Sequence, residues 1–156
     1  MQSKLHYLKA DPKARYQGYM FYFKEGFCWS DINTVFLKCR KKQKSINDVK
    51  SMSLYTLTEK VPEYYIISII NSNFISYYVD SFINKTQSFQ INDARQLPII
   101  IPSEETLLKF ESLFKSAVDT KLAQFQNQIS VNEIENRLND IQKKIDIMVE
   151  ELYGIV

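Results

Sequence analysis

Apolar residues in the last third of the chain recur at helical spacing, in two successive runs. In the first run, from Leu107 to Ile129, they stand three or four positions apart after Ser103, a residue suited to cap a helix N-terminus. The second run follows an S-x-x-E capping box at Ser130 and stops before Gly154. It alternates steps of three and four, the pattern of a coiled-coil seam. The spacing predicts two helices, or one long helix kinked near Ser130.

The chain before Pro102 has a different pattern, in which short extended runs are separated by turn residues. Pro62 begins a predicted helix that reaches about Phe82 with apolar residues at helical spacing. The charged stretch 38–50 is predicted to be a loop, and 99–101 an extended segment between two prolines. The predicted strands are 18–23, 27–30, 34–39, 54–58 and 88–91. These elements predict an α+β fold with a small, β-rich head (1–102), a helix packed on it, and a helical tail (103–156).

Charge divides the chain at the same place. The net charge is only +2, but residues 1–102 hold fourteen Lys and Arg against eight Asp and Glu, which gives +6. Residues 103–156 hold six Lys and Arg against ten Asp and Glu, which gives a net charge of −4. A basic head can collect contacts to phosphates, whereas the acidic tail would be repelled by the same polyanion and should face protein or solvent.

Several classes of protein are disfavoured by what the sequence lacks. No apolar run approaches the roughly 18 to 20 residues that cross a bilayer, and the first residues lead into no signal-peptide core, so we expect a cytoplasmic protein without membrane contact. Cys28, Cys39 and His6 do not have zinc-site spacing, and we expect both cysteines to be buried, reduced thiols. Phosphate-binding glycine loops and catalytic constellations are also missing, so we expect no enzyme active site.

Polar and basic residues in two parts of the head are candidates for contacts with double-stranded DNA. Five cations fall within seven positions after Trp29 and Ser30, and a second group supplies an ammonium, a hydroxyl and an amide. A basic cluster of this kind is as typical of a solvated surface as of a binding site. The candidate residues are Lys38, Arg40, Lys41, Lys42, Lys44, Lys85, Thr86, Gln87, Trp29 and Ser30.

Four segments carry a resemblance to a known family. Tyr64–Ser72, an apolar helix ending in Asn-Ser, and Asn84–Pro98, a polar turn leading to a Leu-Pro exit, resemble the target-recognition domains of bifunctional type II restriction–methyltransferases. Those domains are similar to the halves of type I specificity subunits. Gly26–Ile32 looks like the family's Gly-x-x-Trp element, and Ile141–Gly154 looks like its terminal helix.

The resemblance implies a specificity module of a restriction–modification system that selects a short duplex sequence. The family's N-P-P-Y-type methyltransferase motif and its acidic nuclease motif are both missing here. Catalysis would therefore belong to a partner methyltransferase or endonuclease domain or subunit, where S-adenosylmethionine and a divalent metal are expected, with no cofactor in this chain. Within the shared motif, Asp93, Arg95 and Leu97 are interpreted as architectural, because turns commonly tie polar side chains to backbone groups.

The narrow apolar seams of the tail need a partner surface. They can pack on each other or on the head, or they can pair with another polypeptide, either as a homodimer or with a catalytic domain. Pairing also defines the alternative function, a protein-interaction scaffold in which the basic loop is incidental. The proposed interaction helix presents Ile134, Leu138, Ile141, Ile145, Met148 and Leu152.

Overall fold

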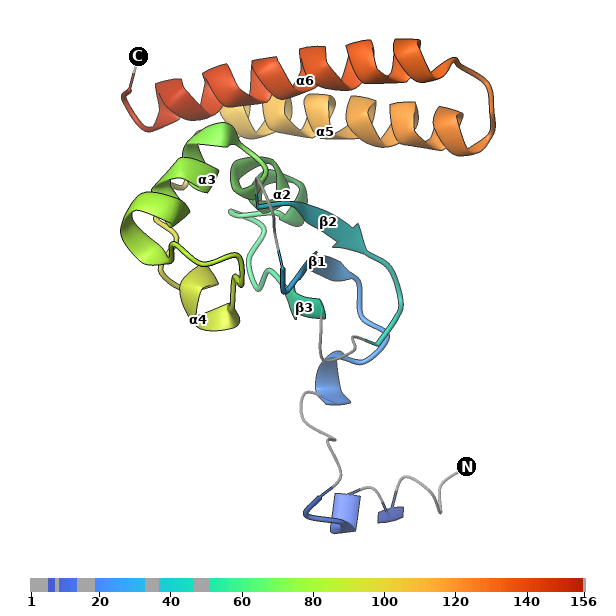
Figure 1. Ribbon diagram of the computed structural model, residues 1–156, viewed down its shortest axis with the longest axis vertical. Helices are drawn as coiled ribbons and strands as arrows, with labels where there is room; N and C mark the ends of the chain where they lie inside the picture. Colours follow the sequence, from blue (N-terminus) through green and yellow to red (C-terminus); the bar gives the residue numbers. More distant parts are fainter. Residues whose placement is uncertain (1–5, 8, 14–18, 33–36, 47–50, 156) are drawn as a thin grey trace.

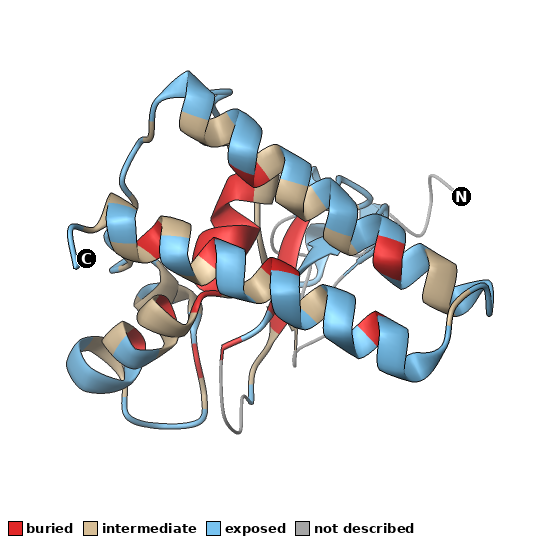
Figure 2. Cartoon of the chain, turned by 90° about the horizontal axis from the view of Figure 1, so that it is seen from above, coloured by how far each residue is buried: buried red, intermediate tan, exposed pale blue. Residues whose placement is uncertain are grey.

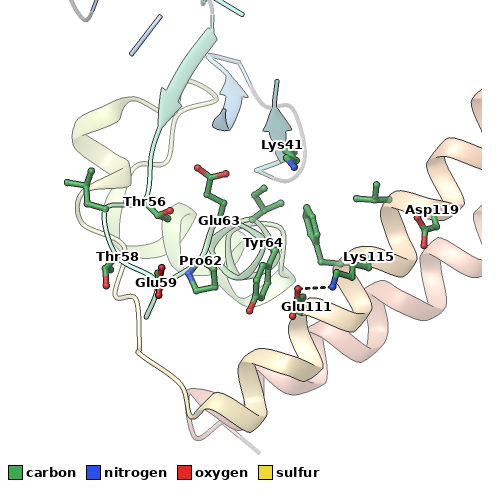
Figure 3. Close-up of a pocket in the computed structure, with 14 residues that line it drawn as sticks. Lys41, Thr56, Thr58, Glu59, Pro62, Glu63, Tyr64, Glu111, Lys115 and Asp119 are labelled. Carbon is green, nitrogen blue, oxygen red and sulfur yellow. Dashed lines mark ion pairs between the residues drawn. The ribbon is translucent and has the colours of Figure 1, made fainter. Parts of the chain in front are cut away.

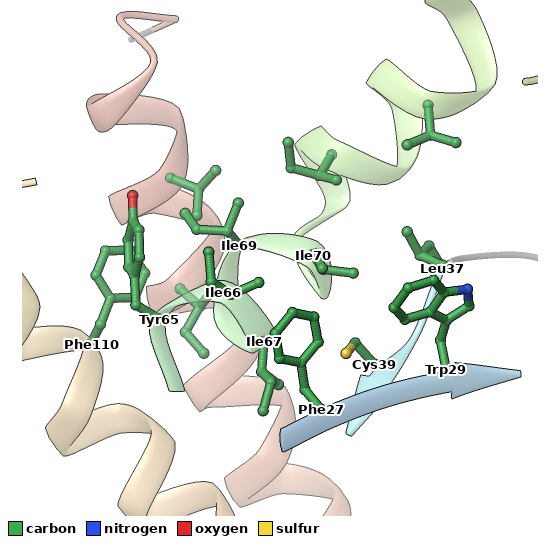
Figure 4. Close-up of a cluster of buried hydrophobic side chains, with 14 of the residues drawn as sticks. Phe27, Trp29, Leu37, Cys39, Tyr65, Ile66, Ile67, Ile69, Ile70 and Phe110 are labelled. Carbon is green, nitrogen blue, oxygen red and sulfur yellow. The ribbon is translucent and has the colours of Figure 1, made fainter. Parts of the chain in front are cut away.

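The computed structural model describes residues 6–7, 9–13, 19–32, 37–46 and 51–155. It has an α+β fold, as predicted: a small antiparallel sheet with short helices forms the head, and a long helical hairpin lies across it (Figure 1). The sheet order is β2-β1-β3, with β1 (Gly26–Ser30) paired to both β2 (Cys39–Lys42) and β3 (Ser51–Leu54). Phe27 and Trp29 stand two positions apart on the central strand, so both side chains enter the core beneath α2 (Figure 4).

The apolar segment after Pro62 forms two helices instead of the one predicted. These are α2 (Glu63–Ile70) and α3 (Asn73–Tyr78), and a π-helical turn (Val79–Ile83) continues α3. The helix breaks because two polar side chains offer the backbone other partners. The Asn71 side chain accepts from Cys39 N at 2.6 Å and donates to Cys39 O at 2.9 Å, while the Ser72 hydroxyl caps α3 by accepting from Ile75 N.

Several predicted strands of the head are wrong or displaced. The aromatic stretch 18–23 holds a 3-10 turn at Tyr19–Phe21, in which Phe21 stacks on Tyr55 outside the sheet. The predicted strand 88–91 does not form. Ser88 pairs with Ile32 in an isolated β-bridge, and the short helix α4 (Ile91–Ala94) follows. The predicted loop 38–50 contains β2, and β3 begins before the predicted 54–58. Positions 33–36 and 47–50 lie outside the described residues.

The tail is a hairpin of two helices, α5 (Glu104–Phe125) and α6 (Val131–Leu152), which settles the choice between two helices and one. Ser103 and Ser130 cap them as predicted, each accepting from the backbone N–H three residues later. Gly154 follows α6 with φ of +68°, a conformation that glycine adopts without strain.

The coiled-coil seam of α6 is used within the chain. Ile134, Ile141 and Ile145 are buried, and Leu138, Met148 and Leu152 are partly buried, because α6 packs on α5 and on the head. One hydrophobic cluster joins Phe27 and Trp29 of the sheet to α2, α5 and α6. The interpretation of this seam as a free interaction helix for a homodimer or a docking partner is therefore wrong. Figure 2 shows the buried residues of the hairpin gathered mainly where it covers the head.

Asp146 joins α6 to the start of α3. Its carboxylate accepts from Asn73 N at 2.8 Å, from Asn73 Nδ2 at 2.9 Å and from Gln142 Nε2 at 3.1 Å. Asp146→Ala would leave these partly buried donors unsatisfied, so we expect a loss of about 1–3 kcal/mol in the free energy of unfolding, measured by urea denaturation. Asp140→Ala, at an exposed position of the same helix, should change it by no more than about 0.5 kcal/mol. Equal losses would contradict this role.

Candidate nucleic-acid interface

Trp29 lies in the core beneath the candidate interface and holds part of it in place. Its side chain is fully buried between Phe27 and Phe89, and it meets the Phe89 ring edge-on with centroids 5.7 Å apart. The indole N–H donates to the Phe89 carbonyl at 2.9 Å, which satisfies the one polar group of a buried tryptophan. Trp29 therefore cannot contact DNA directly, and its assignment as a DNA-binding residue is wrong. It fixes the chain after Gln87 to the central strand.

Residues 84–90 form a hydrogen-bonded turn, which we call the polar turn. The Asn84 side chain accepts from Thr86 N at 2.8 Å, an Asx-turn contact, and donates to Ser88 O and to the Asp93 carboxylate, both at 2.9 Å. Asp93 also accepts from Gln90 N at 2.8 Å. These bonds close the turn on itself, and they confirm the architectural interpretation of Asp93. Leu97 packs against the core, which confirms the same interpretation for that residue.

Asp31, directly after β1, ties the polar turn to the sheet. Its carboxylate accepts from the Ser88 hydroxyl at 2.5 Å and from the Gln90 amide, and its backbone carbonyl accepts from Phe89 N at 3.0 Å. Asp31 was not among the residues predicted for the site. The sequence shows only an Asp directly after an apolar strand. Its partner Ser88 lies 57 positions further along the chain, so sequence spacing could not reveal the contact.

The structure brings part of the candidate set together at this end of β1. Lys85, Thr86 and Gln87 are all exposed on the polar turn. Ser30 ends β1 one position before Asp31, so it lies next to the point where the turn is attached. An ammonium, a hydroxyl and an amide therefore project from a turn whose backbone is held on both sides. Such groups can contact phosphates and base edges.

The basic cluster of β2 does not form a single surface. Successive side chains of a strand point to opposite faces, so Arg40 and Lys41 diverge. Lys41 stands opposite Phe27 and lies 3.9 Å from the Glu25 carboxylate. Lys38 instead donates to the carbonyl of Asn71 at 3.2 Å, and burial lowers its pKa against the opposing effect of Asp146.

Lys42 is a further correction to the candidate set. Its side chain is only 4% exposed, although a lysine in a basic run is expected in solvent. The ammonium donates to Lys24 O at 2.7 Å and lies over the Tyr55 ring, 5.6 Å from the centroid. Lys42 therefore holds neighbouring chain segments together and cannot contact phosphates. Arg40, Lys41 and Lys44 are exposed, and they are distant in sequence from the polar turn.

Cys28 and Cys39 are buried, free thiols, as the sequence predicted. Burial raises the pKa of Cys39 to about 12, with a further contribution from the neighbouring Cys28, so this thiol stays protonated at neutral pH. Within the described part of the chain, no group of three or more His, Cys, Asp or Glu side chains is arranged to hold a metal ion. No helix in that part is both long enough and apolar enough to cross a membrane.

No model of a known protein family matches the chain, and no curated protein is significantly similar to it.

Proposed function

We propose that the chain is a DNA-binding specificity module of a restriction–modification system, with catalysis supplied by a methyltransferase or endonuclease located elsewhere. The observation that carries the proposal is the polar turn, in which Lys85, Thr86 and Gln87 are exposed on a backbone held by Asn84 and Asp31. A turn organised before binding loses little conformational entropy on contact with a groove. The resemblance of Asn84–Pro98 to target-recognition domains supports the same assignment.

In this proposal, the polar turn makes the contacts that depend on base sequence. Gln87 can donate to and accept from a base edge through one planar amide, and Thr86 adds a hydroxyl. Lys85 neutralises a phosphate, a contact that carries no sequence information. Trp29 and Asp31 act indirectly, because they position the turn.

Selection from a pool of random duplexes tests this function. We expect the full chain to retain duplex DNA at low salt, and repeated rounds of binding and amplification to enrich one short sequence. Single base-pair changes in that sequence should weaken binding by about 1–3 kcal/mol each. A chain that retains no duplex at low salt, or that enriches no sequence over successive rounds, would contradict the proposal.

A further inference from the structure

A second apolar surface runs along α5 and extends past the head. Phe110 is buried against Tyr65, with ring centroids 5.1 Å apart. Phe114 lies beside Tyr64, with ring centroids 6.4 Å apart. The apolar face of α5 that carries these two phenylalanines continues through Val118, Leu122 and Phe125, and its side chains become more exposed toward Phe125. The side chain of Leu122 is 51% exposed and that of Phe125 is 81% exposed. We call Phe114, Val118, Leu122 and Phe125 the α5 strip.

The α5 strip begins in a hollow beside α2. The hollow has a volume of about 650 Å³ and lies between α2, α5 and the segment from Thr56 to Pro62 (Figure 3). Its apolar wall includes Tyr64, Ile67 and Phe114, and Val118 lies where the hollow meets the exposed part of the strip. An apolar hollow that opens onto an uncovered helix stripe has the shape of a groove for another polypeptide segment.

Charge around the hollow is predominantly negative. Four carboxylates and two lysines line it, and both lysines already have partners: Lys115 lies 2.8 Å from Glu111, and Lys41 lies 3.9 Å from Glu25. Among the described residues, Glu59, Glu63 and Asp119 have no ion pair. Burial raises the pKa of Glu63, and the nearby Lys41 opposes that shift. A further cation in the hollow would act in the same direction as Lys41.

We propose that a basic amphipathic helix of a partner protein docks on the α5 strip and places a Lys or Arg side chain in the hollow. The aliphatic stem of that side chain would lie against Tyr64 and Phe114, with its charge near Glu63 and Asp119. From Phe114 to Phe125 the strip is about 17 Å long, at about 1.5 Å per residue, so roughly three turns of a helix cover it.

The charge distribution favours this occupant over two others. A second copy of the hairpin would bring residues 103–156, with a net charge of −4, against an acidic rim. Duplex DNA would meet the same repulsion from the carboxylates. Neither argument applies to a basic helix, whose apolar face matches the strip and whose charges complement the rim. This surface is separate from the polar turn.

Two designed peptides test the proposal on the full chain. Each has about 14 residues with Leu at helical three-and-four spacing, and the remaining positions are Lys in one peptide and Glu in the other. We expect the Lys peptide to bind in a 1:1 complex, and the Glu peptide to bind more weakly by about tenfold or more. Glu63→Gln combined with Asp119→Asn should remove most of that difference. Equal binding of the two peptides, or no binding of the Lys peptide, would overturn the proposal.

A matched pair of variants tests the location. Leu122→Ser and Ile147→Ser each remove an aliphatic side chain that is about half exposed, at 51% and 53%, but only Leu122 belongs to the α5 strip. Leu122→Ser should weaken binding of the Lys peptide by about tenfold, and Ile147→Ser should leave it unchanged. Equal effects would overturn the assignment. A wild-type dimer in sedimentation that Leu122→Ser dissociates would identify a second copy as the occupant, and would also overturn it.

Discussion

Trp29→Ala should lower the free energy of unfolding of the protein by several kcal/mol. Trp29 is the largest fully buried side chain, and it connects the central strand to Phe89 through a ring contact and an indole hydrogen bond of 2.9 Å. Replacing a buried Trp with Ala costs about 3–5 kcal/mol, which is a large share of the stability of a small domain, about 5–15 kcal/mol. Urea denaturation followed by far-ultraviolet circular dichroism measures the loss.

Trp29→Phe separates packing from hydrogen bonding at the same position. A phenyl ring keeps much of the buried area but leaves the Phe89 carbonyl without its donor, so we expect a smaller loss of about 1–3 kcal/mol. Wild-type stability in Trp29→Ala would show that the residue is not the anchor of the polar turn. It would also make Trp29 a candidate for direct contact with DNA again.

Replacing two side chains of the polar turn should reduce DNA affinity without unfolding the protein. Thr86→Ala combined with Gln87→Ala removes an exposed hydroxyl and an exposed amide. The two 3.4 Å contacts of the Thr86 hydroxyl with the Ser88 backbone are lost as well, whereas the Asx contact from Thr86 N to Asn84 remains. Each lost base contact should cost about 1–3 kcal/mol of binding free energy. For the duplex selected by the wild-type chain, this predicts a loss of about tenfold or more, measured by fluorescence anisotropy.

Gln126→Ala provides the control for that experiment. Gln126 is also an exposed amide, but it follows α5 at the far end of the hairpin. Its replacement should leave both the affinity and the selected sequence unchanged. If the turn variant and Gln126→Ala bind equally well, the polar turn does not read DNA. If the turn variant loses its folded circular dichroism signal, the same comparison is made with Gln87→Ala alone.

The hairpin could be predicted from sequence because its pattern is long and local. Each helix is 22 residues long, and its caps lie within three positions of the groups they satisfy. The head could not be predicted as well, because its strands are only four or five residues long and their partners are distant in sequence. The burial of Lys42 depends on Lys24 and Tyr55, which no local pattern connects to it.

The candidate site was predicted in part for the same reason. Lys85, Thr86 and Gln87 were identified by residue type, and they are exposed on a turn as a binding role requires. Trp29 was misassigned because its position beside polar residues in sequence does not show which face of the strand it occupies. Asp31 was missed because its function lies entirely in contacts with Ser88, Phe89 and Gln90.

The salt dependence of duplex binding tests most directly whether the polar turn contacts DNA. Lys85→Ala and Lys143→Ala each remove one exposed lysine, the first on the turn and the second on α6. We expect the slope of log affinity against log salt concentration to fall in magnitude by about 0.9 for Lys85→Ala, as for one lost phosphate contact, and to stay unchanged for Lys143→Ala. Identical slopes for the wild-type chain and Lys85→Ala would contradict the proposed interface.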